Sequence, residues 1–259
     1  MKIMRHTLAI YLAGALLTGP AAAEQPYRWL IPHPGKHELI YYPDYSKEKP
    51  GHERATVAGR EIIVPMGVVP PSAQSLYLLS HWEIRDGETV LDIGTGSGVQ
   101  ALFAADHAAH IVATDIGAKA VAAARDNIVR HGLAKKVEVR KGDLFGPIDE
   151  DERFDVILFN IDYPYDEQSQ PLWKVHERFF AGVEQHLEPG GRIYYQAGQI
   201  DNIPHIQAMA EQNGLRITSM RMDAALEVER DPIVFTLYRK ADLQLLQKEQ
   251  AQREYQGEE

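Results

Sequence analysis

The sequence predicts a doubly wound α/β fold, with helices on both faces of a mostly parallel sheet of about seven strands. From Glu88 onward, short β-branched apolar segments alternate with longer segments in which apolar residues recur at helical spacing. This alternation is typical of consecutive βαβ units, whose strands lie parallel in one sheet. The last two apolar segments, 215–222 and 232–240, have no helical segment between them, so we expect an antiparallel edge strand.

The elements can be assigned in chain order. Residues 55–65 predict a hairpin around Ala58 and Gly59, and Ser72 is a suitable N-cap for a helix after a Pro-Pro turn. Further strands are expected at 88–93, 110–116, 136–143, 154–160, 192–198, 215–222 and 232–240. Further helices are expected at 98–108, 118–132, 170–187 and 202–214. The third of these helices should end at the Pro-Gly-Gly of residues 189–191.

The first 23 residues have the three parts of a secretory signal peptide. Lys2 and Arg5 precede an apolar segment, and Ala21 and Ala23 form an A-x-A site with cleavage expected before Glu24. The apolar segment is short for a transmembrane helix, which makes an uncleaved membrane anchor the less favoured alternative. A buried or amphipathic N-terminal helix is the other alternative. We therefore expect an exported, periplasmic protein with no stable membrane span after cleavage.

Four parts of the chain follow from these patterns. Residues 1–23 are the predicted signal peptide, and residues 24–63 form an arm rich in Pro, Gly, Tyr and His that ends in the hairpin. Residues 64–240 carry the alternating pattern of the main domain. Residues 241–259 are a polar C-terminal tail, expected as a helix or a frayed end.

Composition excludes several kinds of site. The chain has no cysteine, which excludes disulfides, thiolate metal sites and cysteine nucleophiles. Its formal charge of −10 disfavours a nucleic-acid partner, because affinity for phosphates comes mostly from Lys and Arg. His33 and His37 stand four apart, but the Pro and Gly residues between them prevent the helix that would bring their rings together. We predict no metal site, and the sequence does not indicate the oligomeric state.

Polar residues and glycines stand at the ends of four predicted strands, which meet at one edge of a parallel sheet. They are Asp92, Gly94, Thr95, Gly96 and Gly98 after the first strand, Asp115 and Ile116 after the second, Asp143 and Leu144 after the third, and Asn160 after the fourth. A carboxylate at 115 can accept hydrogen bonds from both hydroxyls of a ribose, and one at 143 from the exocyclic amine of an adenine. The alternative for each acid is an N-cap of the following helix.

With VLDIGTGSGVQAL at residues 90–102, the chain resembles class I S-adenosylmethionine (SAM)-dependent methyltransferases from about residue 64 to residue 240. The resemblance implies a Rossmann-like fold and SAM as cofactor. It implies that the glycine loop packs against the methionine part of SAM, with Asp92 orienting the loop or holding the amino group. Asp115 would hold the ribose, Asp143 and Leu144 would flank the adenine, and Ile116 is counted with them as a cofactor-binding residue.

The Pro-rich approach to the first helix and an N-x-x-Y motif resemble the branch of release-factor glutamine methyltransferases and related N-methylating enzymes. In that branch the motif is N-P-P-Y, and the Asn side chain and the next carbonyl accept hydrogen bonds from a planar amide or amine. Here the residues are Asn160, Ile161, Asp162 and Tyr163, without the two prolines and the rigidity they give. Asn160, Asp162 and Tyr163 are therefore candidate catalytic residues. Asp162 would be a general base or bind a cationic amine, unless it only faces solvent in a turn.

We favour a SAM-dependent methyltransferase that modifies a nitrogen or oxygen atom of a protein, a peptide or a small molecule. The first alternative is an exported protein of the same fold that binds a ligand without turnover. The second is a nucleic-acid N-methyltransferase, which the N-x-x-Y motif suggests and the acidic charge disfavours.

Overall fold

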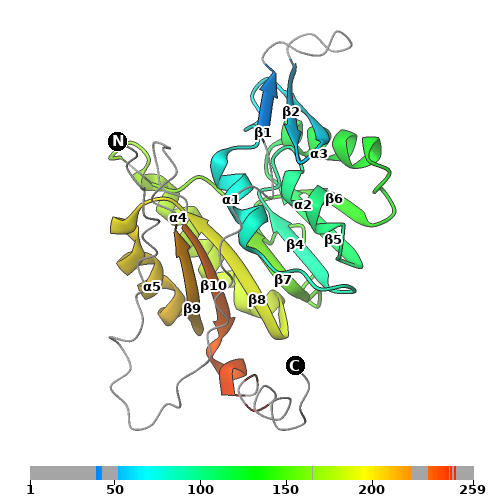
Figure 1. The fold of residues 1–259 in the computed structure, drawn as a ribbon. Helices are drawn as coiled ribbons and strands as arrows, with labels where there is room; N and C mark the ends of the chain where they lie inside the picture. The colour runs from blue at the N-terminus through cyan, green and yellow to red at the C-terminus, as the bar shows by residue number, and fades with distance from the viewer. Residues whose placement is uncertain are drawn as a thin grey trace, which may run out of the picture.

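The computed structural model describes residues 39–42, 52–164, 166–222, 233–244, 246 and 248. The main sheet consists of β4 (Thr89–Ile93), β5 (His110–Asp115), β6 (Val137–Lys141), β7 (Phe154–Phe159), β8 (Leu187–Ala197), β9 (Leu215–Met222) and β10 (Ile233–Arg239). Its seven strands lie in the order β6-β5-β4-β7-β8-β10-β9 (Figure 1). The first five are mutually parallel, and β10 runs antiparallel to both β8 and the edge strand β9. This confirms the predicted mostly parallel sheet with an antiparallel edge.

Helices cover both faces of the sheet. They are α1 (Ala73–His81), α2 (Val99–Ala104), α3 (Ala118–Arg130), α4 (Trp173–Val183) and α5 (Ile203–Gln212), with short 3-10 turns η1 (Gln170–Leu172), η2 (Glu184–His186) and η3 (Ile200–Asn202). Alternate residues of each strand face opposite sides, as in any pleated strand. In β4, Val90 packs into the core beneath α1, α2 and α3, whereas Leu91 packs into the core beneath α4 and α5. The near-continuous apolar strands are thus explained by burial on both faces.

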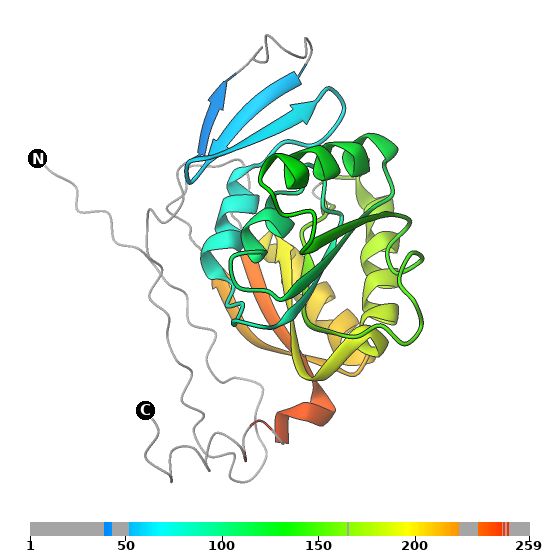
Figure 2. The ribbon, with the colours of Figure 1, turned by 90° about the vertical axis from the view of Figure 1, so that its right-hand side faces the viewer.

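A second, three-stranded antiparallel sheet precedes the main one. It comprises β1 (Leu39–Tyr42), β2 (His52–Val57) and β3 (Arg60–Pro65). The predicted hairpin is present, and Ala58 and Gly59 at its turn both have positive φ, as two-residue hairpin turns with the right twist require. The sequence analysis did not predict strand β1, because apolar and polar residues do not alternate along the arm. Figures 1 and 2 show the small sheet beside α3, which β3 contacts.

Two predicted helix ends differ from the structure. Helix α2 stops at Ala104 rather than at residue 108, because the chain turns and the Ala109 N–H bonds to the Glu88 carbonyl before β5 begins. The helical segment that starts at residue 170 ends with η2, and Leu187 already belongs to β8. The Pro-Gly-Gly at residues 189–191 therefore lies within β8, where the β7–β8 register shifts, and does not end the helix.

Some predictions fall on parts of the chain outside the described residues. These include the signal peptide at 1–23, the His33–His37 pair and most of the C-terminal tail. Residues 240–244 are helical and continue from β10. Among the residues that the structure describes, no helix is long and apolar enough to cross a membrane.

Candidate active site

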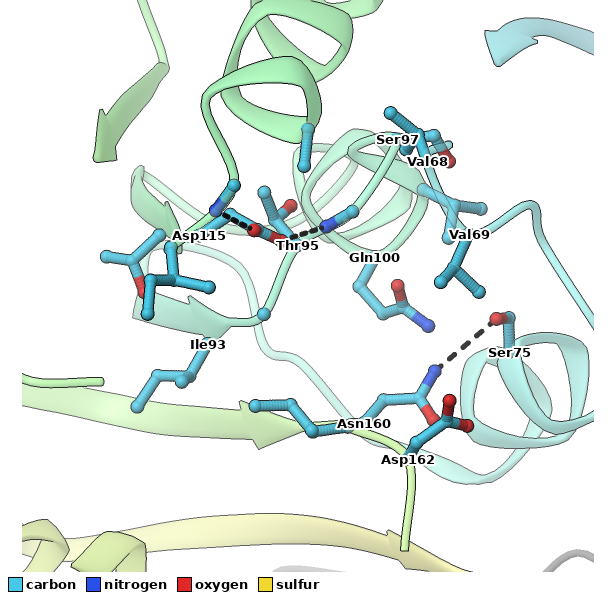
Figure 3. A pocket seen from close by; sticks show the side chains of 18 of the residues that line it. Val68, Val69, Ser75, Ile93, Thr95, Ser97, Gln100, Asp115, Asn160 and Asp162 are labelled. Atoms are coloured by element: carbon cyan, nitrogen blue, oxygen red, sulfur yellow. Dashed lines mark hydrogen bonds between the residues drawn. The ribbon is translucent and has the colours of Figure 1, made fainter. Parts of the chain in front are cut away.

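A cavity of about 710 Å³ opens at the carboxyl ends of β4, β5, β6 and β7. These four strands are neighbours in the sheet, so the segments that follow them form a continuous wall. The lining comes from residues 67–72, 74–75, 93–97, 99–100, 114–117, 119–120, 142–144, 160–163 and 175 (Figure 3). This is the edge at which parallel α/β sheets bind ligands, as the sequence predicted.

Most of the predicted site residues meet in this cavity. Those that line it are Gly94, Thr95, Gly96, Asp115, Ile116, Asp143, Leu144, Asn160, Asp162 and Tyr163. Asp92 and Gly98 do not line it. Asp92 lies behind the glycine loop, and Gly98 at the end of the loop packs against Ala124 of α3, so the contact expected of these two residues with a ligand is indirect.

Asp92 is buried behind the glycine loop and ties it to its own strand. Its Oδ2 accepts a hydrogen bond from the Thr95 hydroxyl at 2.6 Å, and the Ala101 N–H donates to the same carboxylate. Burial raises the pKa of Asp92 to about 7, whereas these two donors lower it. Of the two roles considered for Asp92, this geometry favours orienting the loop.

Two glycines of the loop give room to neighbouring segments. Gly98 has a φ of +88°, and a Cβ there would lie 3.2 Å from the Cα of Ala124 on α3. Gly94 has a φ of +76°, and a Cβ there would lie 2.6 Å from the Ile161 side chain. A larger residue at either place would strain the backbone; at Gly94 it would also collide with the Ile161 side chain, and at Gly98 it would crowd Ala124. The loop can therefore approach both α3 and the Asn160 segment closely.

Asp115 joins the glycine loop to the start of α3. One carboxylate oxygen accepts the Gly96 N–H at 2.9 Å, and the other accepts the Gly117 N–H at 2.8 Å (Figure 3). A carboxylate has about four lone-pair positions, so two acceptor positions stay available toward the cavity. Asp115 can therefore hold the loop and a ligand hydroxyl at the same time.

The end of the cavity at β6 is less enclosed. Asp143 forms an ion pair with Arg178 at 2.9 Å, but both side chains are about half exposed and the pair adds little stability. Leu144 is buried with a φ of +49°, a strained conformation for a residue with a side chain. Ile116 is 66% exposed at the cavity mouth. An acceptor and an apolar surface thus stand side by side, as a heteroaromatic base requires.

Asn160 follows β7 and points toward α1. Its Nδ2 donates to Ser75 Oγ at 3.4 Å, which leaves the carbonyl oxygen of the side chain as an acceptor (Figure 3). Ser75 also accepts the Ser72 N–H at 3.3 Å in the capping box at the start of α1. The orientation of Asn160 is therefore set by the N-terminal end of a helix far away in the sequence.

His176 on α4 holds the Asn160 segment from behind. It is fully buried, with Nε2 3.0 Å from the Asp162 carbonyl oxygen and Nδ1 2.6 Å from the Tyr195 hydroxyl. A carbonyl can only accept, so Nε2 carries the proton and Nδ1 accepts from Tyr195. Burial lowers the pKa of His176 to about 4, so the ring is neutral at neutral pH. The Asp162 side chain itself is exposed on the cavity side.

Tyr163 packs against Gly198, the residue that follows the end of β8. The Tyr163 ring is buried, and a Cβ on Gly198 would lie 1.5 Å from its hydroxyl oxygen and 2.0 Å from Cζ. No side chain at position 198 is compatible with this ring position. Gly198 is therefore the reason that the N-x-x-Y tyrosine can pack inward.

Comparison with known proteins agrees with this geometry. The model of the methyltransferase small domain family matches residues 72–216. The chain belongs to this family. Membership confirms the predicted class I SAM-dependent methyltransferase relationship. The predicted branch is supported by similarity to a release factor glutamine methyltransferase.

Three curated relatives of this methyltransferase-family chain illustrate the range. A release factor glutamine methyltransferase of Cereibacter sphaeroides is 31% identical over 64% of this chain and 66% of its own length. A ribosomal protein L11 methyltransferase of Lactobacillus johnsonii is 32% identical over 52% of this chain and 38% of its own length. A ribosomal RNA small subunit methyltransferase C of Alcanivorax borkumensis is 29% identical over 49% and 40%. The chain matches less than two thirds of the length of each of these relatives.

Solved structures support the fold of this family member. A ribosomal protein L11 methylase from Lactobacillus delbrueckii subsp. bulgaricus superposes with a TM-score of 0.54 at 22% identity, covering 68% of this chain and 84% of that one. The tRNA m1G37 methyltransferase of M. jannaschii gives a TM-score of 0.59 at 17% identity, covering 75% and 58%. At these identities the likeness shows the fold alone, which is the predicted Rossmann-like one.

Sequence reasoning missed three polar residues of the site. Gln100 lines the cavity from α2, and its signal was a lone glutamine in an otherwise apolar helix. Asn127 on α3 donates to the carbonyls of Ile63 and Ser97, both at 2.9 Å, and so links the small sheet to the glycine loop. His176 shares the buried face of α4 with two phenylalanines, and its position in the sequence does not distinguish it from a core residue.

Proposed function

We propose that this protein is a SAM-dependent methyltransferase that transfers a methyl group to a nitrogen or oxygen atom of a protein, peptide or small-molecule acceptor. One observation carries the proposal. The carboxylate of Asp115 and the amide of Asn160 line the same cavity from opposite sides of a glycine loop, with room for a ligand between them. This is the arrangement that a nucleoside cofactor and a second substrate would need.

The residues present fit SAM. Asp115 would accept the two ribose hydroxyls with its remaining lone pairs, and Asp143 would accept the adenine amine. Leu144 and Ile116 offer apolar surface beside the base, and Gly94 and Gly96 allow the loop to approach the cofactor without side chains between. A volume of about 710 Å³ is within the range of small-molecule sites.

The Asn160 segment would position the acceptor. When bound, SAM supplies an electrophilic methyl group, and the chain must aim the acceptor atom at it. The Asn160 side-chain oxygen and the Ile161 carbonyl would accept hydrogen bonds from an N–H acceptor and orient its lone pair. Methylation of a neutral nitrogen releases one proton, which the exposed Asp162 carboxylate would receive and pass to solvent.

Relatives and charge both bear on the acceptor class. Curated relatives are named for ribosomal proteins L11 and uL3 and for release factor glutamine, and one is named for ribosomal RNA. The formal charge of −10 disfavours an RNA backbone. We therefore place a protein or peptide acceptor first and RNA methylation second.

Export remains part of the proposal, and it rests on the pattern of residues 1–23 alone. An exported chain would meet envelope or extracellular acceptors rather than ribosomes. Mass spectrometry of the protein from a periplasmic fraction would test this. A mature N-terminus at Glu24 is expected, and a full-length chain found only with the ribosomal fraction would contradict export.

Calorimetric titration of the purified chain with SAM and S-adenosylhomocysteine would test the proposed function. We expect binding that Asp115→Ala weakens by about 100-fold or more, since hydrogen bonds to charged groups contribute about 1.5–3 kcal/mol each. Asn160→Ala should keep cofactor binding and lose methyl transfer to an acceptor found by screening peptides and RNA. The exposed Asp151 provides a matched control, Asp151→Ala, with no expected change. Absence of binding in the wild-type protein would refute the cofactor assignment.

A further inference from the structure

Asn127 is a fully buried amide at which three segments of the chain meet. It belongs to α3, and its Oδ1 accepts the Ile63 N–H of β3 at 3.0 Å. Its Nδ2 donates to the Ile63 carbonyl and to the Ser97 carbonyl, both at 2.9 Å. Both protons of the amide nitrogen are thus used, one on the small sheet and one on the glycine loop. A single side chain therefore fixes how β3 and the glycine loop stand relative to each other.

Side chains of α3 take the place of a neighbouring strand along one edge of β3. Strand β2 pairs with the other edge. One helical turn beyond Asn127, His131 Nε2 lies 2.7 Å from the Glu61 carbonyl oxygen. The carbonyls of residues 61 and 63 point to the same edge of the strand, because they are two residues apart. His131 thus holds the small sheet at a second point, and its ring makes no hydrogen bond to the glycine loop.

The small sheet leads directly into one wall of the cavity. After β3, residues 66–71 run to the N-cap of α1, and all of them except the first line the cavity. The Val69 carbonyl oxygen would lie 3.7 Å from a Cβ on Gly96, so this segment passes the glycine loop at van der Waals distance. The hydrogen bonds of Asn127 therefore act on both sides of this contact. They hold the glycine loop directly and the 66–71 segment through β3.

The glycine loop cannot shift without affecting α3. Gly98 packs against Ala124, which shares the buried side of α3 with Asn127. Ser97 lines the cavity and is 2% exposed, and its carbonyl is the group that Asn127 binds. A ligand that orders the loop must therefore also order the acceptor of this hydrogen bond. Ile63 receives the other bonds of the same amide and does not line the cavity, so it can report ligand binding without touching the ligand.

We propose that Asn127 is a positioning residue that couples cofactor binding at the glycine loop to the order of the small sheet. A bound cofactor favours the arrangement in which Asn127 binds Ser97 and Ile63 together, and an ordered small sheet in turn raises cofactor affinity, because coupling is reciprocal. This rests on the proposed function, since the ligand is its cofactor, and it adds a control of that site by β1, β2 and β3. A residue that only attached the small sheet would behave as His131 does.

Hydrogen exchange of the wild-type chain, measured by NMR with and without S-adenosylhomocysteine, is the first test. We expect the ligand to slow exchange of the Ile63 amide by about 10-fold more than exchange of the β10 amides. Strand β10 lies in the other half of the sheet from β5 and β6, on which α3 packs, and so reports the general stabilisation by a bound ligand. Protection of the Ile63 amide that does not exceed that of β10 would overturn the inference.

Two variants of α3 separate coupling from attachment. Asn127→Leu keeps a similar volume without polar atoms, whereas His131→Leu removes the bond to the Glu61 carbonyl and keeps the bond to Ser97. We expect Asn127→Leu to weaken S-adenosylhomocysteine by about 10-fold in calorimetry and His131→Leu to stay within about two-fold. The protection of the Ile63 amide by the ligand should disappear in the first variant and persist in the second. Equal ligand affinities in the two variants would mean attachment alone and would overturn the inference.

A conservative substitution guards against a variant that fails to fold. Asn127→Asp keeps the shape of the side chain and can still accept the Ile63 N–H, but an ionised carboxylate cannot donate to the Ser97 carbonyl. We expect it to weaken S-adenosylhomocysteine as Asn127→Leu does. Melting temperatures are measured for all variants. A lower melting temperature of Asn127→Asp with unchanged ligand affinity would mean a structural role and would contradict the coupling.

The proposed function and this inference can fail separately. If the wild-type chain does not bind S-adenosylhomocysteine, the proposed function fails and the inference with it. If the wild-type chain binds the ligand and Asp115→Ala loses it, the cofactor assignment stands. Unchanged exchange of the Ile63 amide on ligand binding would then show that the coupling through Asn127 alone is wrong.

Discussion

The two walls of the cavity are held in different ways. The glycine loop at residues 93–98 is fixed mainly by residues close to it in the chain or on the next strand, such as Asp92 and Asp115, with one further hydrogen bond from Asn127 on α3. The segment at residues 160–163 is fixed from far away, by Ser75 on α1 and His176 on α4. The first wall owes its shape mainly to a local motif, and the second owes its shape to the tertiary structure.

This difference explains how the N-x-x-Y segment can do without prolines. In the N-P-P-Y motif that it resembles, proline restricts φ within the segment itself. Here the Asp162 carbonyl is bound by His176, and Tyr163 is locked between the core and Gly198. Contacts with two other elements thus supply the restriction. We expect the Asn160 wall to be sensitive to substitutions far from the cavity, and the glycine wall to be much less so.

Gly198→Ala should give the largest effect, because it breaks the distant wall alone. The new Cβ would overlap the Tyr163 hydroxyl, whose oxygen lies 1.5 Å from the Cβ position, so the tyrosine must move. A displacement of this order in a positioning segment can lower the rate of methyl transfer by about 100-fold. Hydrogen exchange of residues 160–164 should increase, while cofactor affinity stays near wild type.

Gly182→Ala on α4 is the matched control. A Cβ there would lie 2.8 Å from the Phe145 ring, so it also overpacks the core, but it does not touch the Asn160 segment. We expect a loss of stability similar to that of Gly198→Ala and nearly normal turnover. Equal loss of turnover in the two variants would show that general destabilisation, and not Tyr163, is responsible.

Each wall of the cavity has a buried titratable group behind it, and the two groups should affect the pH dependence of stability in opposite directions. The pKa of Asp92 rises from 3.8 to about 7 on folding, so its contribution to stability is present at low pH and is lost as the pH rises to 7. The pKa of His176 falls from 6.5 to about 4, so its contribution is present above pH 6.5 and is lost as the pH falls. Between pH 5 and 8 the two slopes oppose each other.

Wild-type stability should therefore change little over this pH range. In Asp92→Asn only the contribution of His176 remains, so the free energy of unfolding should increase by about 2 kcal/mol from pH 5 to pH 8. In His176→Phe only the contribution of Asp92 remains, so the free energy of unfolding should decrease by a similar amount over the same range. Urea denaturation at several pH values measures both. Parallel curves for the wild-type protein and the two variants would contradict these assignments.

His176→Phe should also lower turnover directly, by about 10-fold, which is less than the effect of Gly198→Ala. The ring volume is kept, but the Asp162 carbonyl and the Tyr195 hydroxyl lose their partner, at a cost of about 1–3 kcal/mol each. His176→Gln can still donate to the Asp162 carbonyl and should recover part of the rate. If phenylalanine and glutamine behave alike, the hydrogen bond does not position the segment.

How far the sequence reaches depends on how local each feature is. The β–α alternation predicted the sheet and the helices on both faces, because burial on both sides leaves an apolar strand pattern that composition shows directly. The glycine loop after Asp92 could also be predicted, because its tight turn needs glycine at fixed spacing. The end of the helical segment before β8 was wrong, because η2 already ends it at His186.

The sequence by itself determined the fold class, the glycine loop and the row of polar strand ends that includes Asp115 and Asn160. Only the tertiary structure showed that Asp92 supports the loop from behind, that the Gln100 Nε2 group finds no acceptor among the residues the structure describes, and that His176 binds the Asp162 carbonyl. The physical reason is distance along the chain. Backbone geometry and burial periodicity are imposed within a few residues, whereas a hydrogen bond between α4 and the Asn160 segment exists only once both have packed on the sheet.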